Sequence, residues 1–205
     1  MTGDTGQSML RVVLTGSIAT GKSTVLARFA ARGIPVYSAD EAVHALYAGP
    51  GAALVETLFP GTVREGAVDR KELSAALARE PERMPELEEV IHPLVREKAV
   101  AFLEDAEQGG ADLAVIEIPL FYETGTHYAI DKVIVTHCDA AIQRQRVLAR
   151  PSMTEDKLEL ILSRQLSQAE KRARADYAID TSGTMEETIA ATDAVIDALR
   201  TGAAR

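Results

Sequence analysis

Apolar residues gather in four short runs, at residues 10–15, 34–37, 113–118 and 133–136, and in a weaker fifth run at residues 177–180. The run at residues 113–118 is almost continuously apolar, which is typical of a strand that is buried on both faces of a sheet. Longer stretches between the runs carry helix-forming residues with amphipathic spacing. Short strands that alternate with helices predict a doubly wound parallel α/β domain with five strands.

The stretch between the second and third expected strands is far longer than a usual crossover connection. It contains no strong strand signal, and glycine and proline residues divide it into helical segments. We expect this stretch, residues 41–112, to be a helical insertion that forms part of a second binding site. The expected helices of the whole chain cover residues 25–31, 41–47, 52–59, 71–79, 82–108, 140–175 and 185–199.

The segment GSIATGKST at residues 16–24 fits the phosphate-binding pattern G-x-x-x-x-G-K-[ST] at Gly16, Gly21, Lys22 and Ser23. It lies between an expected strand and an expected helix, where successive backbone N–H groups surround a polyphosphate at a helix N-terminus. Lys22 is expected to reach the β- and γ-phosphates, and the Ser23 hydroxyl is expected to ligate Mg²⁺. A chance glycine-rich turn is the alternative, but four matching positions in the right context favour binding of a nucleoside triphosphate.

The composition is ordinary for a globular protein, with 46% hydrophobic and 26% charged residues. No apolar run approaches about 18 residues, so no membrane span is expected. Residues 1–9 lack the regions of a signal peptide and are interpreted as a disordered leader, with Met9 as an alternative start. The lone cysteine, Cys138, excludes an internal disulfide and agrees with a reducing cytoplasm. The histidines show no zinc-ligand spacing.

The net charge of −9 argues against nucleic-acid binding as the main function. Residues 143–176 are nevertheless basic, with eight Arg or Lys residues against five Asp or Glu residues. This local excess indicates either a bound polyanion smaller than nucleic acid or a solvated helical face of mixed charge. Charge alone favours neither interpretation.

The choice between a GTPase switch and a kinase depends on residues outside the phosphate loop. Asp180 and Gly183 form a D-x-x-G sequence far from that loop, and the chain contains no asparagine for guanine recognition, so a GTPase is weakly supported. A small-molecule kinase needs an acceptor-activating carboxylate, an acceptor pocket and a cationic lid. Asp40, at the carboxyl end of the second strand, is expected to accept the acceptor proton or to hold the water shell of the metal. A helix N-cap is its alternative role.

The candidate lid cations are Arg144, Arg146, Arg150 and Arg164, because guanidinium groups offset the charge that phosphoryl transfer concentrates. Surface arginines on a solvated helix are the alternative interpretation.

Four more polar residues lie in the insertion, at the end of the third strand or directly after the turn that follows it. His92 and Arg96 share a helical face at a spacing of four residues, although a lone histidine is more often structural. Glu117, near the end of the third strand, is suited to support the Mg²⁺ shell. Glu123 follows the turn at residues 119–122 and is suited to face the acceptor.

Together these segments resemble the dephospho-coenzyme A kinase family over residues 10–199. The resemblance begins with LTGSIATGKSTV and SADEAVHAL and continues with VDRKEL, IHPLVR and IPLFYE. It closes with Gln143, Arg146 and Arg150 at the lid entry and with RQLSQAEKRARADYAIDTSG at residues 164–183. The phosphate loop is common to many families, whereas the combination of IHPLVR, IPLFYE and ADYAID is specific.

The resemblance implies ATP-dependent phosphorylation of the ribose 3′-hydroxyl of dephospho-CoA, which gives CoA and ADP in the last step of CoA biosynthesis. It implies that Asp40 is the catalytic base and that Lys22, Arg146, Arg150 and Mg²⁺ stabilise the transferred charge. The acceptor site is then formed by Asp40, His92, Arg96, Leu120 and Glu123. The nucleotide site is formed by Gly16, Ala19, Thr20, Gly21, Lys22, Ser23, Thr24, Thr181 and Gly183, with Ser23 as the metal ligand.

The implied architecture is one domain, residues 10–205, of the P-loop NTPase type: a parallel five-stranded sheet with flanking helices, a helical acceptor-binding insertion and a helical lid. The core is expected at residues 10–40, 113–139 and 176–200, the insertion at residues 41–112 and the lid at residues 140–175. We expect a cytoplasmic protein, a monomer or weak homo-oligomer, without a nucleic-acid or membrane partner.

Some positions depart from the family pattern. Ser17 and Ala19 stand where the family loop has glycine, and side chains there reduce backbone freedom. Thr181 stands where asparagine is usual beside the adenine, and Glu117 where aspartate is common. Pro151 replaces an acidic residue, which is expected to stiffen the lid hinge.

Two rival functions remain open. A nucleoside or nucleotide kinase needs aromatic residues that stack on an acceptor base, and only Tyr47 and Phe59 are obvious in the insertion. A nucleotide-dependent switch predicts slow hydrolysis, a response to a partner and no phosphorylated small molecule.

Overall fold

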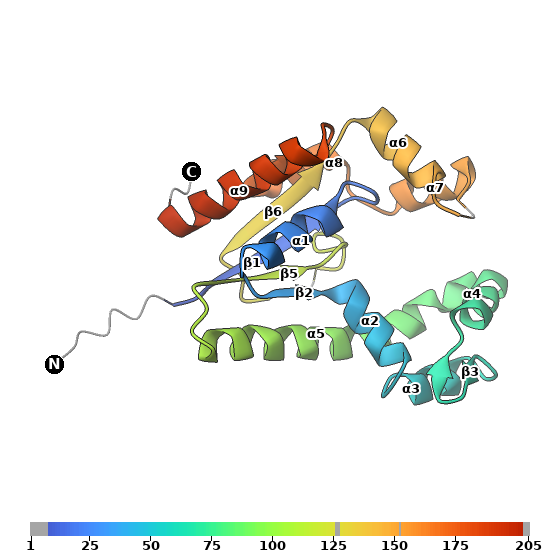
Figure 1. Cartoon of the computed structure of the whole chain (residues 1–205). Coiled ribbons are helices and arrows are strands. Elements are labelled where there is room, and N and C mark those ends of the chain that lie inside the picture. The colour runs from blue at the N-terminus through green and yellow to red at the C-terminus, as the bar shows by residue number, and fades with distance from the viewer. Residues whose placement is uncertain (1–7, 126–127, 152, 203–205) are drawn as a thin grey trace. The chain divides into compact units, whose positions relative to one another are not determined.

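The computed structural model describes residues 8–125, 128–151 and 153–202 (Figure 1). It divides into two compact units: the sheet unit, which comprises Met1–Tyr37 and Leu103–Arg205, and the helical unit, Ser38–Phe102. Of the leader expected at residues 1–9, residues 1–7 lie outside the described part, and Met9 is buried in the core. None of the described helices is long and apolar enough to cross a membrane.

The sheet unit contains a five-stranded parallel sheet with the strand order β2-β5-β1-β6-β7 (Figure 1). β1 lies at the centre and pairs in parallel with β5 and β6. The five predicted strands are confirmed, and every residue of β5 is buried, as its continuous apolar run indicated. The strands are β1 (Leu10–Gly16), β2 (Val36–Ser38), β5 (Leu113–Glu117), β6 (Lys132–His137) and β7 (Tyr177–Asp180).

The register of the parallel strands determines where the chain can form a ligand site. Gly16 at the end of β1 lies opposite Thr136 of β6, and His137 of β6 lies opposite Asp180 of β7. The carboxyl ends of these three strands are therefore level at one edge of the sheet. The segments that follow them are neighbours there, although the segment after β1 is more than a hundred residues from the other two in the sequence.

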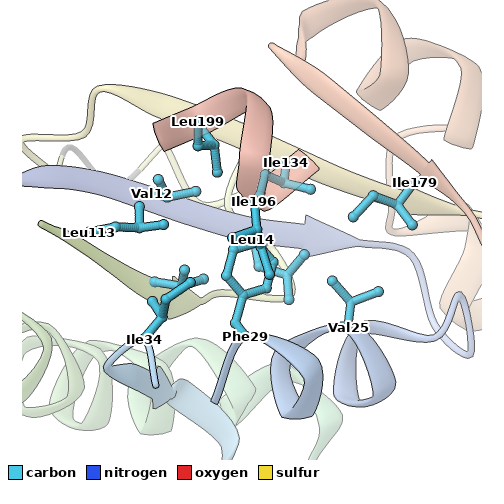
Figure 2. Packing of buried hydrophobic residues seen from close by; sticks show 11 residues of the cluster. Val12, Leu14, Val25, Phe29, Ile34, Leu113, Ile134, Ile179, Ile196 and Leu199 are labelled. Carbon is cyan, nitrogen blue, oxygen red and sulfur yellow. The ribbon is translucent and has the colours of Figure 1, made fainter. Parts of the chain in front are cut away.

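Two helices cover one face of the sheet and enclose its core. Figure 2 shows Phe29 of α1 (Lys22–Ala31) and Ile196 of α9 (Met185–Thr201) packed against Leu14 of β1. Each fully buried side chain of this kind contributes about 1.5–3 kcal/mol relative to an exposed one. The core cluster consists of Val12, Leu14, Val25, Phe29, Ile34, Leu113, Val115, Ile134, Ile179, Ile196 and Leu199.

The helical unit departs from its prediction at one place. Its helices are α2 (Ala39–Tyr47), α3 (Ala52–Leu58), α4 (Arg70–Arg79), the 3-10 turn Pro81–Arg83, and α5 (Met84–Gln108), which continues into the sheet unit. The insertion expected to be helical, residues 41–112, also contains strands that were not predicted, because β3 (Val63–Arg64) and β4 (Ala67–Val68) form an antiparallel hairpin. Glu65 and Gly66 turn the chain with φ of 50° and 80°, as a two-residue hairpin loop requires. Strands of two residues are too short to show an alternating pattern.

The segment expected to be one helical lid, residues 140–175, forms three helices, α6 (Ala140–Leu148), α7 (Glu155–Ser163) and α8 (Gln168–Arg174). Side-chain caps begin the second and third helices: the Thr154 side chain accepts a hydrogen bond from the N–H of Lys157, and Ser167 forms a capping box with Glu170. A capping hydroxyl takes the place of a missing backbone partner, so these residues restart a helix after each break.

Candidate active site

The loop between β1 and α1 approaches the ends of β6 and β7 so closely that glycine is needed at both of its ends. A Cβ atom on Gly16 would lie 2.8 Å from the carbonyl oxygen of Thr136, and one on Gly21 would lie 3.1 Å from the Thr181 side chain. Gly21 also has φ 83°, in the left-handed region that favours glycine. The two glycines of the sequence motif are therefore required by packing as well as by ligand approach.

The amides at the start of α1 are arranged for an anion. Within the described residues, the N–H groups of Ala19 and Gly21 donate no hydrogen bond. Gly21 is the N-cap of α1 without a side-chain cap, and the first turn holds no acidic residue. Unpaired N–H groups at a helix N-terminus carry partial positive charge, which stabilises a bound phosphate.

The side chains of Lys22 and Thr20 both bond to the loop backbone. Lys22 Nζ donates to the carbonyl oxygens of Gly16 at 2.9 Å and Ser17 at 3.1 Å. The Thr20 hydroxyl is buried, 2.9 Å from the Ser17 carbonyl oxygen and 2.8 Å from the hydroxyl of Thr136. The Thr20 side chain therefore stabilises the shape of the loop.

Ser17 and Ala19 of the loop differ in backbone conformation. Ala19 has φ 58°, a left-handed conformation that costs a residue with a side chain about 1–2 kcal/mol. Among the described residues other than glycine, positive φ occurs only at Ala19 and Glu65, so Ser17 has an ordinary backbone. The lost backbone freedom therefore has a conformational cost at Ala19, whereas the φ of Ser17 lies outside the left-handed region.

A pocket of about 270 Å³ opens at the start of α1. It gathers eight of the predicted residues from three distant parts of the sheet unit. Thr184, Met185 and Thr188, at the start of α9, complete it, and these three were not predicted from the sequence. The sequence clue to these three residues is that they follow Gly183 closely in the chain. Only the order of the strands brings this segment beside the phosphate loop. The predicted residues that line the pocket are Ala19, Gly21, Ser23, Thr24, Arg146, Arg150, Thr181 and Gly183.

Thr181 joins the lid to the phosphate loop. Its buried Oγ1 lies 3.1 Å from the carbonyl oxygen of Thr20 and 3.2 Å from that of His137. Arg146 donates to Thr181 twice, from Nη1 to Oγ1 at 3.1 Å and from Nη2 to the carbonyl oxygen at 2.6 Å. The guanidinium group of Arg146 is thus held at the pocket wall by a residue of the β7 end.

The other predicted lid arginines are not equivalent. Arg144 pairs with Glu155 and, at 3.2 Å, with Glu159, and the hydrogen bond to Glu155 raises the pKa of its guanidinium. It belongs to a surface of mixed charge, which was the alternative interpretation. Arg150 lines the pocket, and within the described residues its side chain makes no hydrogen bond or ion pair. Arg164 is exposed and does not line the pocket.

Leu120 and Glu123 belong to one turn after β5. The carbonyl oxygen of Leu120 accepts the N–H groups of Glu123 at 3.2 Å and of Thr124 at 3.0 Å. Glu123 Oε1 accepts the N–H of Leu166 at 2.9 Å and lies 2.8 Å from Nζ of the fully buried Lys171. The turn is thereby fastened to the segment between α7 and α8.

The helical unit carries the remaining predicted residues. Asp40 is the second residue of α2, directly after β2, and it is exposed. The N-cap of α2 is Ser38, whose hydroxyl accepts the N–H of Glu41 at 3.4 Å, so the alternative role of Asp40 as a cap is wrong. His92 and Arg96 are both exposed on α5, at the expected helical spacing. Within the described residues, none of these three side chains makes a hydrogen bond or ion pair.

A second, more polar hollow of about 760 Å³ lies beside β7 and α8 and is lined by His137, Arg172, Asp176, Tyr177 and Asp180 among others. Burial, and secondly the charge of Arg172, lowers the pKa of the His137 imidazole. Among the described residues, no group of three or more His, Cys, Asp or Glu side chains is placed to hold a metal.

The comparisons with known proteins agree with one another. A family model described as dephospho-CoA kinase matches residues 10–187. A dephospho-CoA kinase of Brucella melitensis biotype 1 is 52% identical over 179 residues, which cover 87% of this chain and 90% of the relative.

Two solved structures resemble this chain along most of its length. The protein in a crystal structure from Thermus thermophilus is 30% identical in sequence, with a TM-score of 0.76. The match covers 93% of this chain and 97% of that chain. A dephospho-CoA kinase from Campylobacter jejuni is 25% identical with a TM-score of 0.67, and the match covers 92% of this chain and 96% of that one.

Proposed function

The chain belongs to the dephospho-CoA kinase family, and from this premise we propose which of its residues bind the substrates and carry the reaction. As a member of the family it is a kinase that phosphorylates dephospho-CoA, the final step of CoA biosynthesis, with ATP as the second substrate. We propose that the acceptor atom is the ribose 3′-hydroxyl and that the products are CoA and ADP.

ATP binds in the pocket at the start of α1. The observation that carries this proposal is the convergence of unpaired N–H groups, two arginines and the β7 end in one pocket. The phosphates contact the backbone of Gly16, Ala19, Thr20 and Gly21 together with Lys22, Ser23 and Thr24. The adenine lies beside Thr181 and Gly183, where Met185, with 56% of its surface exposed, offers an apolar contact.

Mg²⁺ binds at Ser23. The Ser23 hydroxyl is exposed and lines the pocket, and no acidic cluster competes with it within the described residues. This donor set fits Mg²⁺, which keeps several waters and takes its other ligands from substrate phosphates. Glu117, buried at the end of β5, supports the water shell. When bound at Ser23, Mg²⁺ would supply positive charge that offsets the negative charge of the phosphates.

Asp40 is the catalytic base. Its carboxylate is exposed, has no partner within the described residues and does not cap its helix, so it remains available for the proton of the acceptor hydroxyl. In-line transfer then depends on positioning and on charge stabilisation. Lys22 and Arg150 stabilise the transferred group. Arg146 joins them when its bonds to Thr181 are exchanged for contacts with the nucleotide.

The residues that we propose to contact dephospho-CoA are His92, Arg96, Leu120 and Glu123, in addition to Asp40. His92 and Arg96 provide exposed polar groups on α5, and Leu120 and Glu123 shape the turn after β5. We propose three functional parts of the chain. The core, residues 10–40, 113–139 and 176–200, binds the nucleotide; the insertion, residues 41–112, binds the acceptor; and residues 140–175 form the lid. We further propose a cytoplasmic enzyme that acts as a monomer or weak homo-oligomer without nucleic-acid or membrane partners.

The test is a coupled assay of ADP release with Mg-ATP, in which dephospho-CoA is compared with a panel of nucleosides and nucleotides. Mass spectrometry of the product verifies that one phosphate is added, and NMR spectroscopy determines which hydroxyl carries it. Asp40→Asn is compared with Glu41→Gln, a matched removal of charge at the next residue of the same helix turn. Loss of a general base lowers kcat by about 10²–10⁴-fold, so we expect that loss for Asp40→Asn and near-normal turnover for Glu41→Gln.

Each outcome has a separate meaning. Phosphate at another hydroxyl contradicts the proposed acceptor atom, and near-normal turnover of Asp40→Asn removes Asp40 from the role of base. Release with a nucleoside in place of dephospho-CoA contradicts the acceptor. Release that depends on no acceptor, by a folded protein that binds ATP, indicates a switch.

A further inference from the structure

The Ile18 residue of the phosphate loop is held by side chains from outside the loop on both of its polar groups. Its N–H donates to Oε1 of Gln165 at 3.2 Å, and its carbonyl oxygen accepts from Nε2 of Gln143 at 2.8 Å. Gln143 belongs to α6, and Gln165 lies between α7 and α8. Neither glutamine lines the pocket, so neither is placed to contact the nucleotide.

The orientation of Gln143 is determined by a chain of amides. Its Nε2 faces the Ile18 carbonyl oxygen, and its Oε1 therefore accepts from Nε2 of Gln168 at 2.9 Å. Gln168 Oε1 accepts in turn the backbone N–H of Cys138 at 2.9 Å, at the end of β6. Gln143 is only 5% exposed, so water competes little for these bonds. The end of the sheet thus determines where the Gln143 amide points.

Because the peptide bond is planar, the contacts to Ile18 also determine the direction of the N–H group of the next residue, which is available to a ligand. The carbonyl of Ile18 and the N–H of Ala19 belong to one trans peptide plane and point in opposite directions. Gln143 therefore directs the Ala19 N–H away from α6. That N–H donates no hydrogen bond within the described residues, and Ala19 lines the pocket.

The preceding peptide plane is controlled in the same way. The N–H of Ile18 and the carbonyl of Ser17 point in opposite directions. Gln165 holds the N–H, so the Ser17 oxygen faces Lys22 Nζ at 3.1 Å. The segment that carries Gln165 is itself fastened, because the next residue, Leu166, donates to Glu123 at 2.9 Å.

We propose that Gln143 and Gln165 are positioning residues that set two successive peptide planes of the phosphate loop for binding the β-phosphate. The proposal rests on the proposed function in one respect, that this loop binds the phosphates of ATP. Without the two amides, the Ala19 N–H turns away from the phosphate, and the left-handed φ of 58° at Ala19 is free to relax.

The test compares ADP with AMP as ligands, because the two nucleotides differ by the β-phosphate alone. Binding of each, with Mg²⁺, is measured by calorimetry for Gln143→Met and Gln165→Met, which keep side-chain length but remove the amide. Gln145→Met is the matched control, since Gln145 is exposed on α6 and makes no side-chain hydrogen bond within the described residues.

We expect each of the two variants to bind ADP about 10-fold more weakly, as for the loss of one charge-assisted hydrogen bond, and AMP within about twofold of the original protein. The control should bind both nucleotides normally. In steady-state assays the KM for ATP should rise and the KM for dephospho-CoA should stay within about twofold.

Equal losses for ADP and AMP would indicate a merely structural role and overturn the proposal, as would unchanged binding of ADP. If Gln143→Met does not fold, Gln165→Met carries the same test, because Gln165 is only half-buried. An original protein that binds ADP no better than AMP contradicts the proposed phosphate site itself, and that failure is visible before any substitution is made.

Discussion

The ion pair between Lys171 and Glu123 allows a quantitative prediction of stability. Lys171 is fully buried in α8, and its Nζ lies 2.8 Å from Oε1 of Glu123, whose side chain is 13% exposed. The two atoms form an ion pair by distance, but within the described residues Nζ makes no hydrogen bond of good geometry and neither does Glu123 Oε2. The charges have therefore lost most of their hydration, and their mutual attraction is the main compensation.

Removal of the ammonium group leaves the carboxylate of Glu123 without that compensation. Breaking a buried pair in this way typically costs 3–5 kcal/mol. Glu123 keeps the N–H of Leu166 and a small contact with water, which places Lys171→Met at the lower limit, about 3 kcal/mol. For a chain of this size, about 1 kcal/mol lowers Tm by about 2–4 °C, so we expect a loss of about 6–12 °C.

The assay is differential scanning calorimetry of Lys171→Met, of the double variant Lys171→Met with Glu123→Gln, and of the control Lys98→Met. Lys98 is exposed and has no side-chain partner within the described residues, so its variant should stay within about 0.5 kcal/mol of the original. The double variant buries no charge at this position, and its Tm should recover to within about 2–4 °C of the original.

Two results would contradict a cost that arises from the unpaired Glu123 carboxylate. A loss of less than about 3 °C for Lys171→Met would mean that Glu123 is well solvated or finds another partner. A double variant that is as unstable as the single one would mean that packing of the lysine stem, and not the unpaired charge, carries the cost.

Two further predictions concern the phosphate loop and the His137 hollow. Gly16→Ala should abolish measurable ATP binding in calorimetry while the protein stays folded by circular dichroism, because the added Cβ would lie 2.8 Å from the Thr136 carbonyl oxygen; retained binding would contradict this. The pKa of His137 is lowered in the folded state, so the stabilisation it provides is complete above pH 6.5 and is lost as the pH falls. Tm should therefore decrease less between pH 7.5 and 5.5 in His137→Asn than in the original protein, and an identical decrease would contradict the assignment.

Local rules account for what could be predicted of the fold. The buried strand β5 is marked by a continuous apolar run, and the loop before α1 is marked by the spacing of its glycines. Both patterns lie within a short window of the sequence, so both elements could be predicted. The hairpin of β3 and β4 was missed because two-residue strands carry no period. The lid was predicted as one helical stretch because each break between its helices is marked by a single capping residue, Thr154 or Ser167.

The partners of the site residues could not be inferred from local sequence. Thr181 was expected only beside the adenine, yet its side chain also bonds to the loop and to Arg146. These contacts join residues that are 35 and 161 positions apart. They exist because parallel strands place their carboxyl ends at one edge of the sheet, and the order of the strands decides which segments meet there.

Residue types and their spacing were sufficient to predict the class of fold, the phosphate loop, the resemblance to a family and a set of candidate residues. Three-dimensional packing determines that Arg144 pairs on the surface while Arg146 and Arg150 line the pocket. It also decided that Ser38, and not Asp40, caps α2, and that glutamines of the lid hold the loop. The physical reason is that a hydrogen bond requires atoms about 3 Å apart in a defined direction, and for residues far apart in the chain only the packed sheet supplies that geometry.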